Sequence, residues 1–298
     1  MPTKTKRVVD AECKVGENPL WHPEEERLYW CDIPRGRLHW YDPESDTAGI
    51  AHENKERIGG FTIQEDGTLL LFQELGTVRR LDLADGGVDT VVTADPERFE
   101  ERFNDVIADP AGRVFAGTMP DPEAGVPGRL YRLDRDAAFA TVIDECILPN
   151  GMGFTGDQET LYFTDSAQTD PETAGRIYRY EYDVATGTIS DPEIFVNSSG
   201  VDGFPDGLTV DTEDYVWSAF WNGSHAYRFD PAGNRVAAVE FPVRNVSSVA
   251  FGGTDRDRLY ITTASVDGRD TEAEEEGSLF RIQPRINGRS EFRSKITV

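Results

Sequence analysis

Apolar and polar residues alternate along this chain in short, strand-length segments, and no segment carries the apolar stripe of an amphipathic helix. The clearest unit covers residues 204–230. Within it, Leu208-Thr209-Val210, Val216-Trp217-Ser218-Ala219-Phe220 and Ala226-Tyr227-Arg228-Phe229 are each typical of a β-strand. The polar run Asp211-Thr212-Glu213-Asp214 is typical of a tight turn. The pattern therefore predicts three successive strands joined by short turns.

Five further copies of this unit occur along the chain. Their second strands are predicted to start near residues 28, 69, 114, 161 and 259, and that of the first unit near 216. A period of about 40–55 residues is typical of propeller blades. Six units of about four strands each predict an all-β, six-bladed β-propeller. We expect one domain over residues 1–298, in which an N-terminal strand around Arg7-Val8-Val9-Asp10 completes the last blade.

Polar residues mark the start of the first strand in most of these units. The first strand of each propeller blade lines the central channel, so equivalent positions at the strand starts converge on the axis. Asp and Asn are also common turn residues, so each of these positions has a purely structural alternative. Counting back about ten residues from each second strand, within the blade repeat, selects Glu17, Gly60, Asn104, Asn150, Asp206 and Ser248.

Two carboxylates and two amide carbonyls in this set would form an oxygen-rich site. Such a site suits one hard divalent cation, namely calcium, magnesium or manganese, with zinc or iron as alternatives. The four histidines lie outside the set and are interpreted as structural or surface residues: His22, His39, His52 and His225. The three cysteines are widely spaced, which favours thiols over a disulfide framework or a zinc site: Cys13, Cys31 and Cys146.

The charge balance is strongly acidic, with 55 Asp and Glu against 30 Lys and Arg and a net charge of −25. A nucleic-acid partner requires a basic face, so this class of partner is excluded. No apolar run is long enough to span a membrane, and the N-terminus lacks an apolar signal region, so we expect a cytoplasmic protein. The charge also suggests a cell with high internal salt, with an acidic protein from an ordinary cell as the alternative.

Several motifs, taken in chain order, resemble those of the SMP-30/gluconolactonase/regucalcin family. The resemblance covers nearly the whole chain and implies a six-bladed propeller that holds one divalent metal ion in its channel. It further implies hydrolysis of a sugar lactone, such as a pentono- or gluconolactone, to the aldonic acid in oxidative sugar breakdown. The motifs are Gly16-Glu17-Asn18-Pro19-Leu20-Trp21, Arg102-Phe103-Asn104-Asp105, Asp109 to Met119, Leu148-Pro149-Asn150-Gly151 and Pro205-Asp206-Gly207.

By this resemblance Glu17, Asn150 and Asp206 are the metal ligands, and Arg102 and Asn104 hold the substrate. A bound metal ion would polarise the lactone carbonyl. Asp206 could then take a proton from the attacking water, with a hydroxide held by the metal as the alternative nucleophile. The structural alternative for Arg102 is a surface residue that neutralises neighbouring glutamates.

The sequence departs from the family pattern after its Gly-Thr-Met segment. Family members often place an acidic residue there to bind sugar hydroxyls, whereas this chain reads Pro120-Asp121-Pro122-Glu123. The preferred sugar therefore stays open. The other hypotheses are a related metal-dependent esterase or phosphotriesterase, and a calcium-binding propeller without catalytic activity. In each case we expect a small-molecule partner, no membrane, and a monomer or weak oligomer.

The excess of acidic residues predicts that salt stabilises the fold. Repulsion among like charges destabilises a compact chain, and this repulsion falls as the Debye length shortens from about 10 Å at 0.1 M salt to about 3 Å at 1 M. We expect the melting temperature, followed by circular dichroism, to rise steadily between low and molar KCl. A melting temperature that does not rise would contradict the hypothesis of adaptation to high salt.

Overall fold

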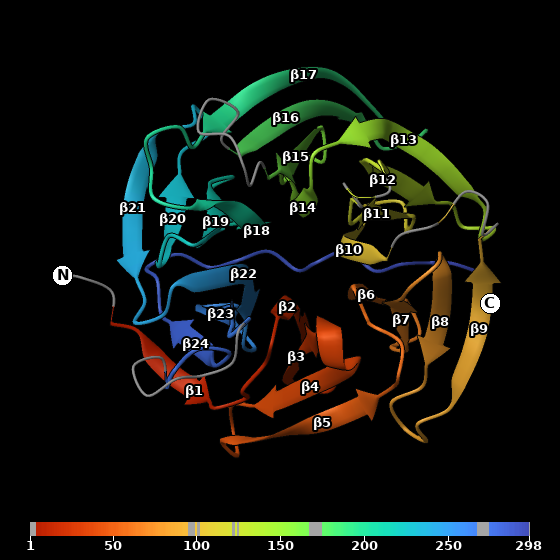
Figure 1. The fold of residues 1–298 in the computed structure, drawn as a ribbon, viewed down its shortest axis with the longest axis horizontal. Coiled ribbons are helices and arrows are strands. Elements are labelled where there is room, and N and C mark those ends of the chain that lie inside the picture. The colour runs from red at the N-terminus through yellow and green to blue at the C-terminus, as the bar shows by residue number, and fades with distance from the viewer. Residues whose placement is uncertain are drawn as a thin grey trace.

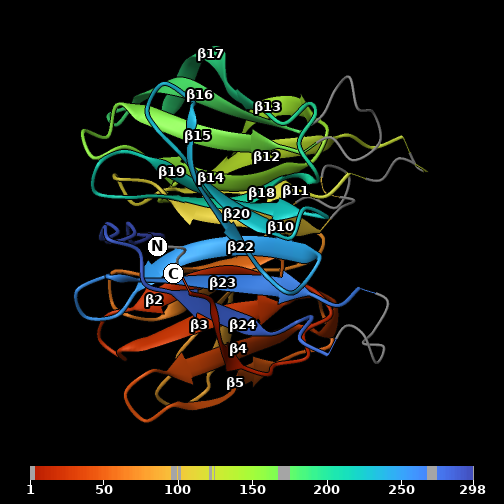
Figure 2. The ribbon, with the colours of Figure 1, turned by 90° about the vertical axis from the view of Figure 1, so that its left-hand side faces the viewer.

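The computed structural model describes residues 4–94, 99, 102–120, 123, 125–166, 175–266 and 274–297. Six four-stranded antiparallel sheets follow one another around a central axis, which confirms the predicted all-β, six-bladed propeller (Figure 1). Seen from the side, the blades form a thick disc (Figure 2). Within the described ranges, the chain forms no helix long and apolar enough to cross a membrane. One short 3-10 helix, Ile33–Arg35, follows the second strand of the first blade.

Each blade takes its four strands from the axis outward, and we number the blades 1 to 6 in chain order. The innermost strands are β2 (Gly16–His22), β6 (Gly60–Ile63), β10 (Phe103–Ala108), β14 (Pro149–Phe154), β18 (Phe204–Val210) and β22 (Asn245–Gly252). The second strands are β3 (Arg27–Asp32), β7 (Leu69–Phe72), β11 (Val114–Thr118), β15 (Thr160–Asp165), β19 (Val216–Trp221) and β23 (Arg258–Ala264). The third strands are β4 (Arg37–Asp42), β8 (Thr77–Leu81), β12 (Gly128–Leu133), β16 (Arg176–Asp183), β20 (His225–Phe229) and β24 (Leu279–Ile282). The outer strands are β5 (Thr47–Glu53), β9 (Val88–Thr93), β13 (Phe139–Cys146), β17 (Thr188–Asn197), β21 (Arg235–Glu240) and β1 (Lys6–Val9).

Aspartates end many of the strands by capping the turn that follows. The Asp42 carboxylate accepts a hydrogen bond of 2.8 Å from the backbone N–H of Glu44. Asp211 accepts one of 2.9 Å from the N–H of Glu213, also two residues further on. A side chain that satisfies a turn N–H in this way takes the place of a backbone acceptor. Part of the acidic composition therefore serves the turns that the blade repeat requires.

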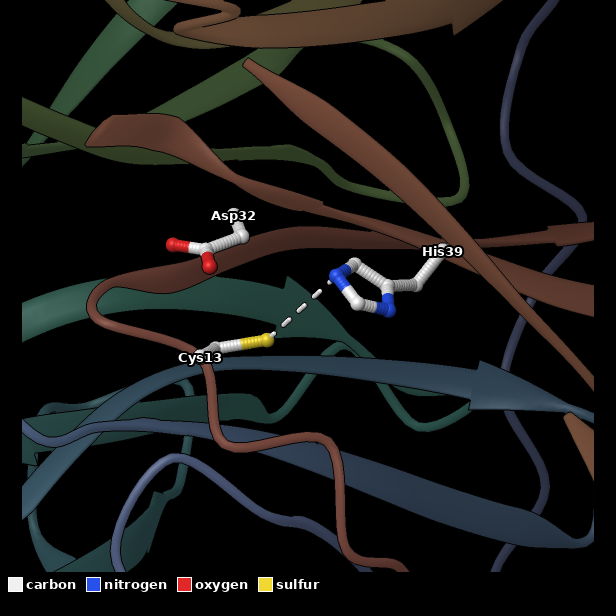
Figure 3. Close-up of side chains that lie close together, drawn as sticks. All are labelled: Cys13, Asp32 and His39. Atoms are coloured by element: carbon white, nitrogen blue, oxygen red, sulfur yellow. Dashed lines mark hydrogen bonds between the residues drawn. The ribbon is translucent and has the colours of Figure 1, made fainter. Parts of the chain in front are cut away.

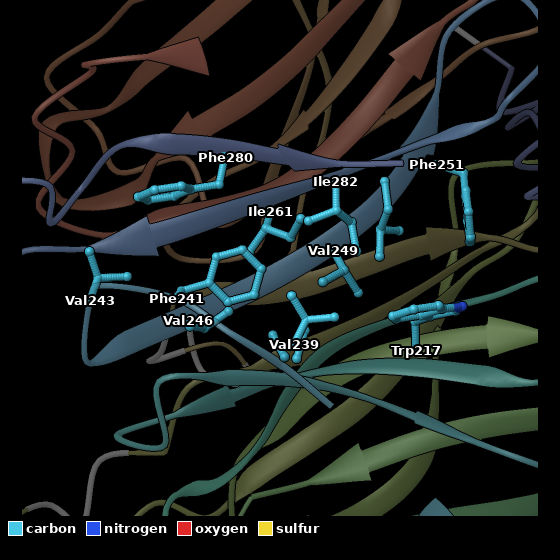
Figure 4. Packing of buried hydrophobic residues seen from close by; sticks show 13 residues of the cluster. Trp217, Val239, Phe241, Val243, Val246, Val249, Phe251, Ile261, Phe280 and Ile282 are labelled. Carbon is cyan, nitrogen blue, oxygen red and sulfur yellow. The ribbon is translucent and has the colours of Figure 1, made fainter. Parts of the chain in front are cut away.

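The apolar side chains of adjacent blades pack against each other around the ring. Between blades 5 and 6, Trp217 and Val239 pack with Val249, Ile261 and Phe280, and all five are at most 5% exposed (Figure 4). In the described part of the chain, each of the six neighbouring pairs of blades shares one such core. Sheet-to-sheet packing of this kind supplies the hydrophobic stabilisation of the fold.

The two ends of the chain meet in blade 6. Strand β1 pairs antiparallel with β24, so the outer strand of the last blade comes from the N-terminus. The core between blades 6 and 1 includes Tyr41, whose ring lies 6.2 Å from that of Tyr260 in an edge-to-face arrangement. Pairing of β1 with β24 unites the two ends of the chain in one blade and thereby closes the ring.

Residues 285–297, here called the C-terminal strap, run across the end of the channel where the first strands finish (Figure 1). Gly288 pairs with Asp211 of blade 5, and Ser294 pairs with Gln64 of blade 2. The N–H of Lys295 then donates to the carbonyl of Gly112 in blade 3 at 2.8 Å. Ile296 is 4% exposed within the core between blades 2 and 3. The strap therefore ties together blades that are not neighbours in the ring.

Loss of the buried strap side chain should destabilise the whole ring. Ile296→Ala removes a buried aliphatic group, and we expect it to lower the free energy of unfolding by about 2–4 kcal/mol. Ile194→Ala is the matched control, because Ile194 lies on β17 and is 52% exposed. The control should change the free energy by no more than about 0.5 kcal/mol. Equal effects of the two substitutions in urea unfolding would show that the strap does not contribute to stability.

Candidate metal and substrate site

Irregularities near the beginning of the innermost strands shape one end of the channel. In blades 3, 4 and 5 two residues of the first strand face one residue of the second, which is a β-bulge. Blade 1 has the same irregularity and blade 6 a related one, whereas β6 of blade 2 pairs without a shift. A bulge interrupts the alternation of a strand and re-aims its side chains. The bulged positions are Asn18-Pro19, Asn104-Asp105, Asn150-Gly151, Asp206-Gly207 and Ser247.

The structure brings Glu17, Asn104, Asn150 and Asp206 together at this end of the channel. Each is buried, with an exposed fraction between 4% and 8%. The amide Nδ2 of Asn104 donates to Oδ1 of Asn150 at 2.5 Å. Glu17 and Asp206 lie near enough for the charge of Asp206 to raise the pKa of Glu17. Four residues from four different blades therefore form one polar cluster.

The other two positions of the predicted set, Gly60 and Ser248, add no side chain to the cluster. Gly60 has no side chain to contribute, and a Cβ added there would lie 2.9 Å from Cγ2 of Val106. Ser248 lies deeper and lines the cavity below the cluster. Asp206 itself was expected to precede its strand, but β18 begins at Phe204, so Asp206 lies inside the strand at its bulge.

Glu17 is also not the exact counterpart of the other three residues, because the pairing register aligns Asn18 with them. Asn18 adopts a positive φ of 48°, and its side chain forms hydrogen bonds that serve the fold. Its Oδ1 accepts a hydrogen bond of 2.6 Å from the N–H of Phe61, and its Nδ2 donates to the carbonyl of Val106 at 3.4 Å. The residue before the bulge, Glu17, then carries the carboxylate into the cluster.

Hydrogen bonds fix the orientation of both asparagine side chains. Asn150 donates from Nδ2 to Oγ of Ser166 at 2.8 Å, and Ser166 donates in turn to the carbonyl of Pro205. This chain of bonds leaves Oδ1 of Asn150 directed toward Asn104. The Oδ1 of Asn104 accepts from Nη1 of Arg102 at 3.0 Å. Arg102 therefore points inward to the cluster instead of outward as a surface residue.

Asp206 differs from the turn aspartates in the hydrogen bonds that its carboxylate oxygens accept. Asp42 and Asp211 accept hydrogen bonds from turn N–H groups, as described above. No residue in the described part of the chain donates a hydrogen bond to the carboxylate of Asp206, although Asp206 is only 4% exposed. Buried carboxylates are usually paired with a donor or a cation. The oxygens of Asp206 are thus available for a ligand.

Burial and like charge act together on the acids of the cluster. Burial, followed by the charges of Asp206 and Asp105, raises the pKa of Glu17 well above its ordinary value. Burial, followed by the charge of Asp105, raises the pKa of Asp206 in the same way. The guanidinium of Arg102 opposes the shift in the pKa of Glu17, and burial lowers the pKa of Arg102 itself to about 10. The cluster therefore favours either a proton or a cation between its carboxylates.

Asp105 is a third acid of this cluster that the sequence analysis did not select. It is 7% exposed, and burial raises its pKa to about 7. Counting from the second strands selects one position per blade, and alternation places the next residue on the opposite face of the strand. An acid between Asn104 and Val106 on a buried strand was the signal that such alternation fails at this point.

A second buried group of polar residues lies in blade 1, outside the channel cluster. The ligand atoms of Cys13, Asp32 and His39 lie within 4.8 Å of one another, and Sγ of Cys13 is 3.9 Å from Nε2 of His39 (Figure 3). The carboxylate of Asp32 already accepts from the N–H of Val15 at 3.2 Å and from Arg35 at 2.9 Å. Since both Asp32 oxygens have donors, this group is explained as packing of the loop before β2.

The region expected to contact the sugar is only partly described. Asp121 and Pro122 lie outside the described residues, and so do Glu100 and Glu101, the expected partners of a surface Arg102. Glu123 is described and exposed.

Fold and site together define a six-bladed propeller with an acidic cluster buried at one end of its channel. The chain belongs to the SMP-30/Gluconolactonase/LRE-like family, whose model matches residues 15–265. This match confirms the resemblance drawn from the sequence motifs.

The chain is similar to three further proteins over most of its length. The chain is 46% identical to the pentonolactonase XacC of Haloferax volcanii over 297 residues, which cover 97% of this chain and 98% of that protein. It is 32% identical to a 6-deoxy-6-sulfogluconolactonase of Pseudomonas putida over 260 residues, 87% of this chain and 86% of the relative. The crystal structure of a calcium-binding regucalcin from Agrobacterium tumefaciens superposes with a TM-score of 0.90 at 25% identity, covering 99% of both chains.

The raised pKa of Asp105 predicts how pH affects the protein in the presence of a chelator. The pKa of this carboxyl is 3.8 in the unfolded chain and about 7 in the folded chain. Ionisation therefore favours the unfolded state, and stability is lost as the pH rises through this window. Without metal, Asp105→Asn should melt at a higher temperature than the wild type at pH 8 and show little gain at pH 4. A variant that is less stable than the wild type at pH 8 would contradict this electrostatic interpretation.

Proposed function

We propose that this protein is a metal-dependent lactonase that opens a pentonolactone to the corresponding aldonic acid. Lactonase activity is supported by membership of the family and by the named activities of two relatives. The pentonolactone is favoured because the 46% identical relative, similar over nearly its whole length, is a pentonolactonase. The observation that carries the proposal is the cluster of Glu17, Asn150 and Asp206, buried at one end of the channel. In it Glu17 accepts a hydrogen bond of 3.3 Å from the N–H of Asn18, and Asp206 accepts none from a described residue.

The cluster fits a divalent cation. Glu17 and Asp206 would supply carboxylate oxygens and Asn150 its Oδ1, which are the ligands of hard cations such as calcium, magnesium or manganese. Ser166 holds the amide nitrogen of Asn150. The Oδ1 of Asn150 accepts one hydrogen bond, from Asn104, and its second lone pair is left for a ligand. The calcium-binding regucalcin of the same fold favours calcium among these ions, with zinc and iron as alternatives. A bound cation would also relieve the repulsion between the buried acids.

The residues of the cluster divide the work of lactone hydrolysis. A bound divalent cation supplies Lewis-acid chemistry, which polarises the carbonyl of the lactone. Asp206 takes a proton from the attacking water while the water oxygen bonds to the carbonyl carbon. When the ring C–O bond breaks, Asp206 returns this proton to the departing ring oxygen. Arg102 and Asn104 hold substrate hydroxyls or the new carboxylate by hydrogen bonds.

Substitution of the two carboxylates should abolish turnover without unfolding the protein. Asp206→Asn and Glu17→Gln keep the side-chain volume and remove one charge each, and we expect kcat/KM to fall at least about 100-fold. Glu213→Gln is the control, because Glu213 lies in blade 5 as Asp206 does but has a 56% exposed side chain. Proton release from the lactone, followed with a pH indicator, provides the assay. Near-normal turnover by Asp206→Asn would exclude it as the base.

The same assay separates the alternative functions. Pentono- and hexonolactones, a lactone without hydroxyls and an organophosphate should be compared before and after chelation and after addition of each metal. The proposal expects the highest activity on a pentonolactone and its loss on chelation. Turnover that survives chelation would contradict the metal. Preference for the organophosphate would favour a phosphotriesterase, and tight metal binding without acid release from any lactone would favour a non-catalytic calcium-binding propeller.

A further inference from the structure

The bulge of β10 differs from the other two-residue bulges in the side chain of its second residue. In blades 1, 4 and 5 this position holds Pro19, Gly151 and Gly207, none of which has a polar side chain. In blade 3 it holds Asp105, directly after Asn104. Since a bulge breaks the alternation of a strand, two consecutive polar side chains of blade 3 can serve the same site.

Gly151 and Gly207 are required where they stand. A Cβ added to Gly151 would lie 2.3 Å from the backbone nitrogen of Leu208, and one added to Gly207 would lie 2.0 Å from Oγ of Ser248. Neighbouring blades therefore approach each other too closely for a side chain at these two positions. Blade 3 has room at this level of the channel, and an acid occupies it.

The carboxylate of Asp105 has no hydrogen-bond donor among the described residues. Its Oδ2 is fully buried and without a partner. A buried oxygen in this state destabilises the fold, and more so when it is charged, so native proteins retain it where an ion or a ligand satisfies it. Asp105 also lines the cavity beneath the cluster, together with Gly151, Leu208 and Ser248. The unsatisfied group thus borders the channel.

The charges of the cluster balance only when a cation with two positive charges is included. Asp105 lies near enough to Glu17 and Asp206 to affect the pKa of both. Arg102 is the cation that acts on Glu17 and Asp105. Three carboxylates and one guanidinium give a net charge of −2 when all are ionised. One divalent cation neutralises this charge, whereas without Asp105 the same cation would leave an excess of +1.

We propose that Asp105 is a third carboxylate ligand of the divalent cation and sets the affinity of the site for it. This inference rests on the metal site of the proposed function. The cavity that Asp105 lines is bordered mainly by apolar residues such as Val106, Met152 and Phe292, with few polar side chains among them. These surroundings do not suit a polyhydroxylated sugar. Asp105 therefore faces the ion, and proton transfer belongs to Asp206.

Metal titration of Asp105→Asn tests this role. The chelated protein is titrated with calcium chloride, and with manganese chloride in a second series, by calorimetry and by the rise in melting temperature. We expect the dissociation constant to increase at least about 10-fold. Asp105→Glu keeps the charge and should bind metal more tightly than Asp105→Asn.

Glu291→Gln is the matched control. Glu291 belongs to the C-terminal strap, lines the same cavity as Asp105 and accepts a hydrogen bond of 3.3 Å from Thr209. Its substitution removes one acid of the cavity away from the cluster, so the dissociation constant should not change. An equal loss of affinity in both variants would show a general effect of cavity charge and would overturn the assignment of Asp105 as a ligand.

The outcomes distinguish this inference from the proposed function. If the wild type binds metal and Asp105→Asn binds it equally tightly, the inference is overturned while the metal site of the proposed function stands. If affinity is unchanged but kcat at saturating metal is lost, Asp105 takes part in proton transfer, and the inference is again overturned. If the wild type binds neither metal, the metal-dependent function fails, and the inference fails with it.

Discussion

Mutual repulsion of buried carboxylates at one end of the channel is the constraint on which this structure depends. Glu17, Asp105 and Asp206 lie in a region of low exposure, and burial raises the pKa of each. An unpaired buried charge destabilises a fold by several kcal/mol. The cluster can persist only because the surrounding scaffold is held together independently of it. The residues that stabilise the fold and the residues of the cluster therefore lie in different parts of the blades.

The scaffold meets this requirement with features distributed around the ring. Each pair of neighbouring blades shares an apolar core in the described chain, and β1 closes the ring by pairing with β24. The C-terminal strap connects blades 5, 2 and 3 across the far end of the channel. Asn18 and Ser166 then use hydrogen bonds to place their neighbours. Local strain at the cluster is thus opposed by many contacts elsewhere, as is common at functional sites.

The strand repeat could be predicted from the sequence because its physical signals are local. Alternation, turn residues and the blade period located each second strand to within one residue, as for β11 at Val114 and β15 at Thr160. The bulges could not be predicted in this way, because a bulge depends on how two strands pair and not on either strand alone. For that reason the sequence repeat aligned Glu17 with the bulge residues of the other blades, whereas strand pairing aligns Asn18 with them. For the same reason Asp105 was not selected.

The same constraint explains how one residue type serves two purposes in this chain. Asp211 and Asp206 belong to the same blade and are both buried. Asp206 lies at the bulge near the beginning of β18, and Asp211 directly follows its last residue. Asp211 accepts hydrogen bonds from the N–H of Glu213 and from Nε1 of Trp217 and forms an ion pair with Arg228, so its charge is compensated inside the blade. Asp206 has no such donor among the described residues. The two aspartates therefore differ not in kind but in whether the fold satisfies their oxygens, and this difference supports the proposed role of Asp206.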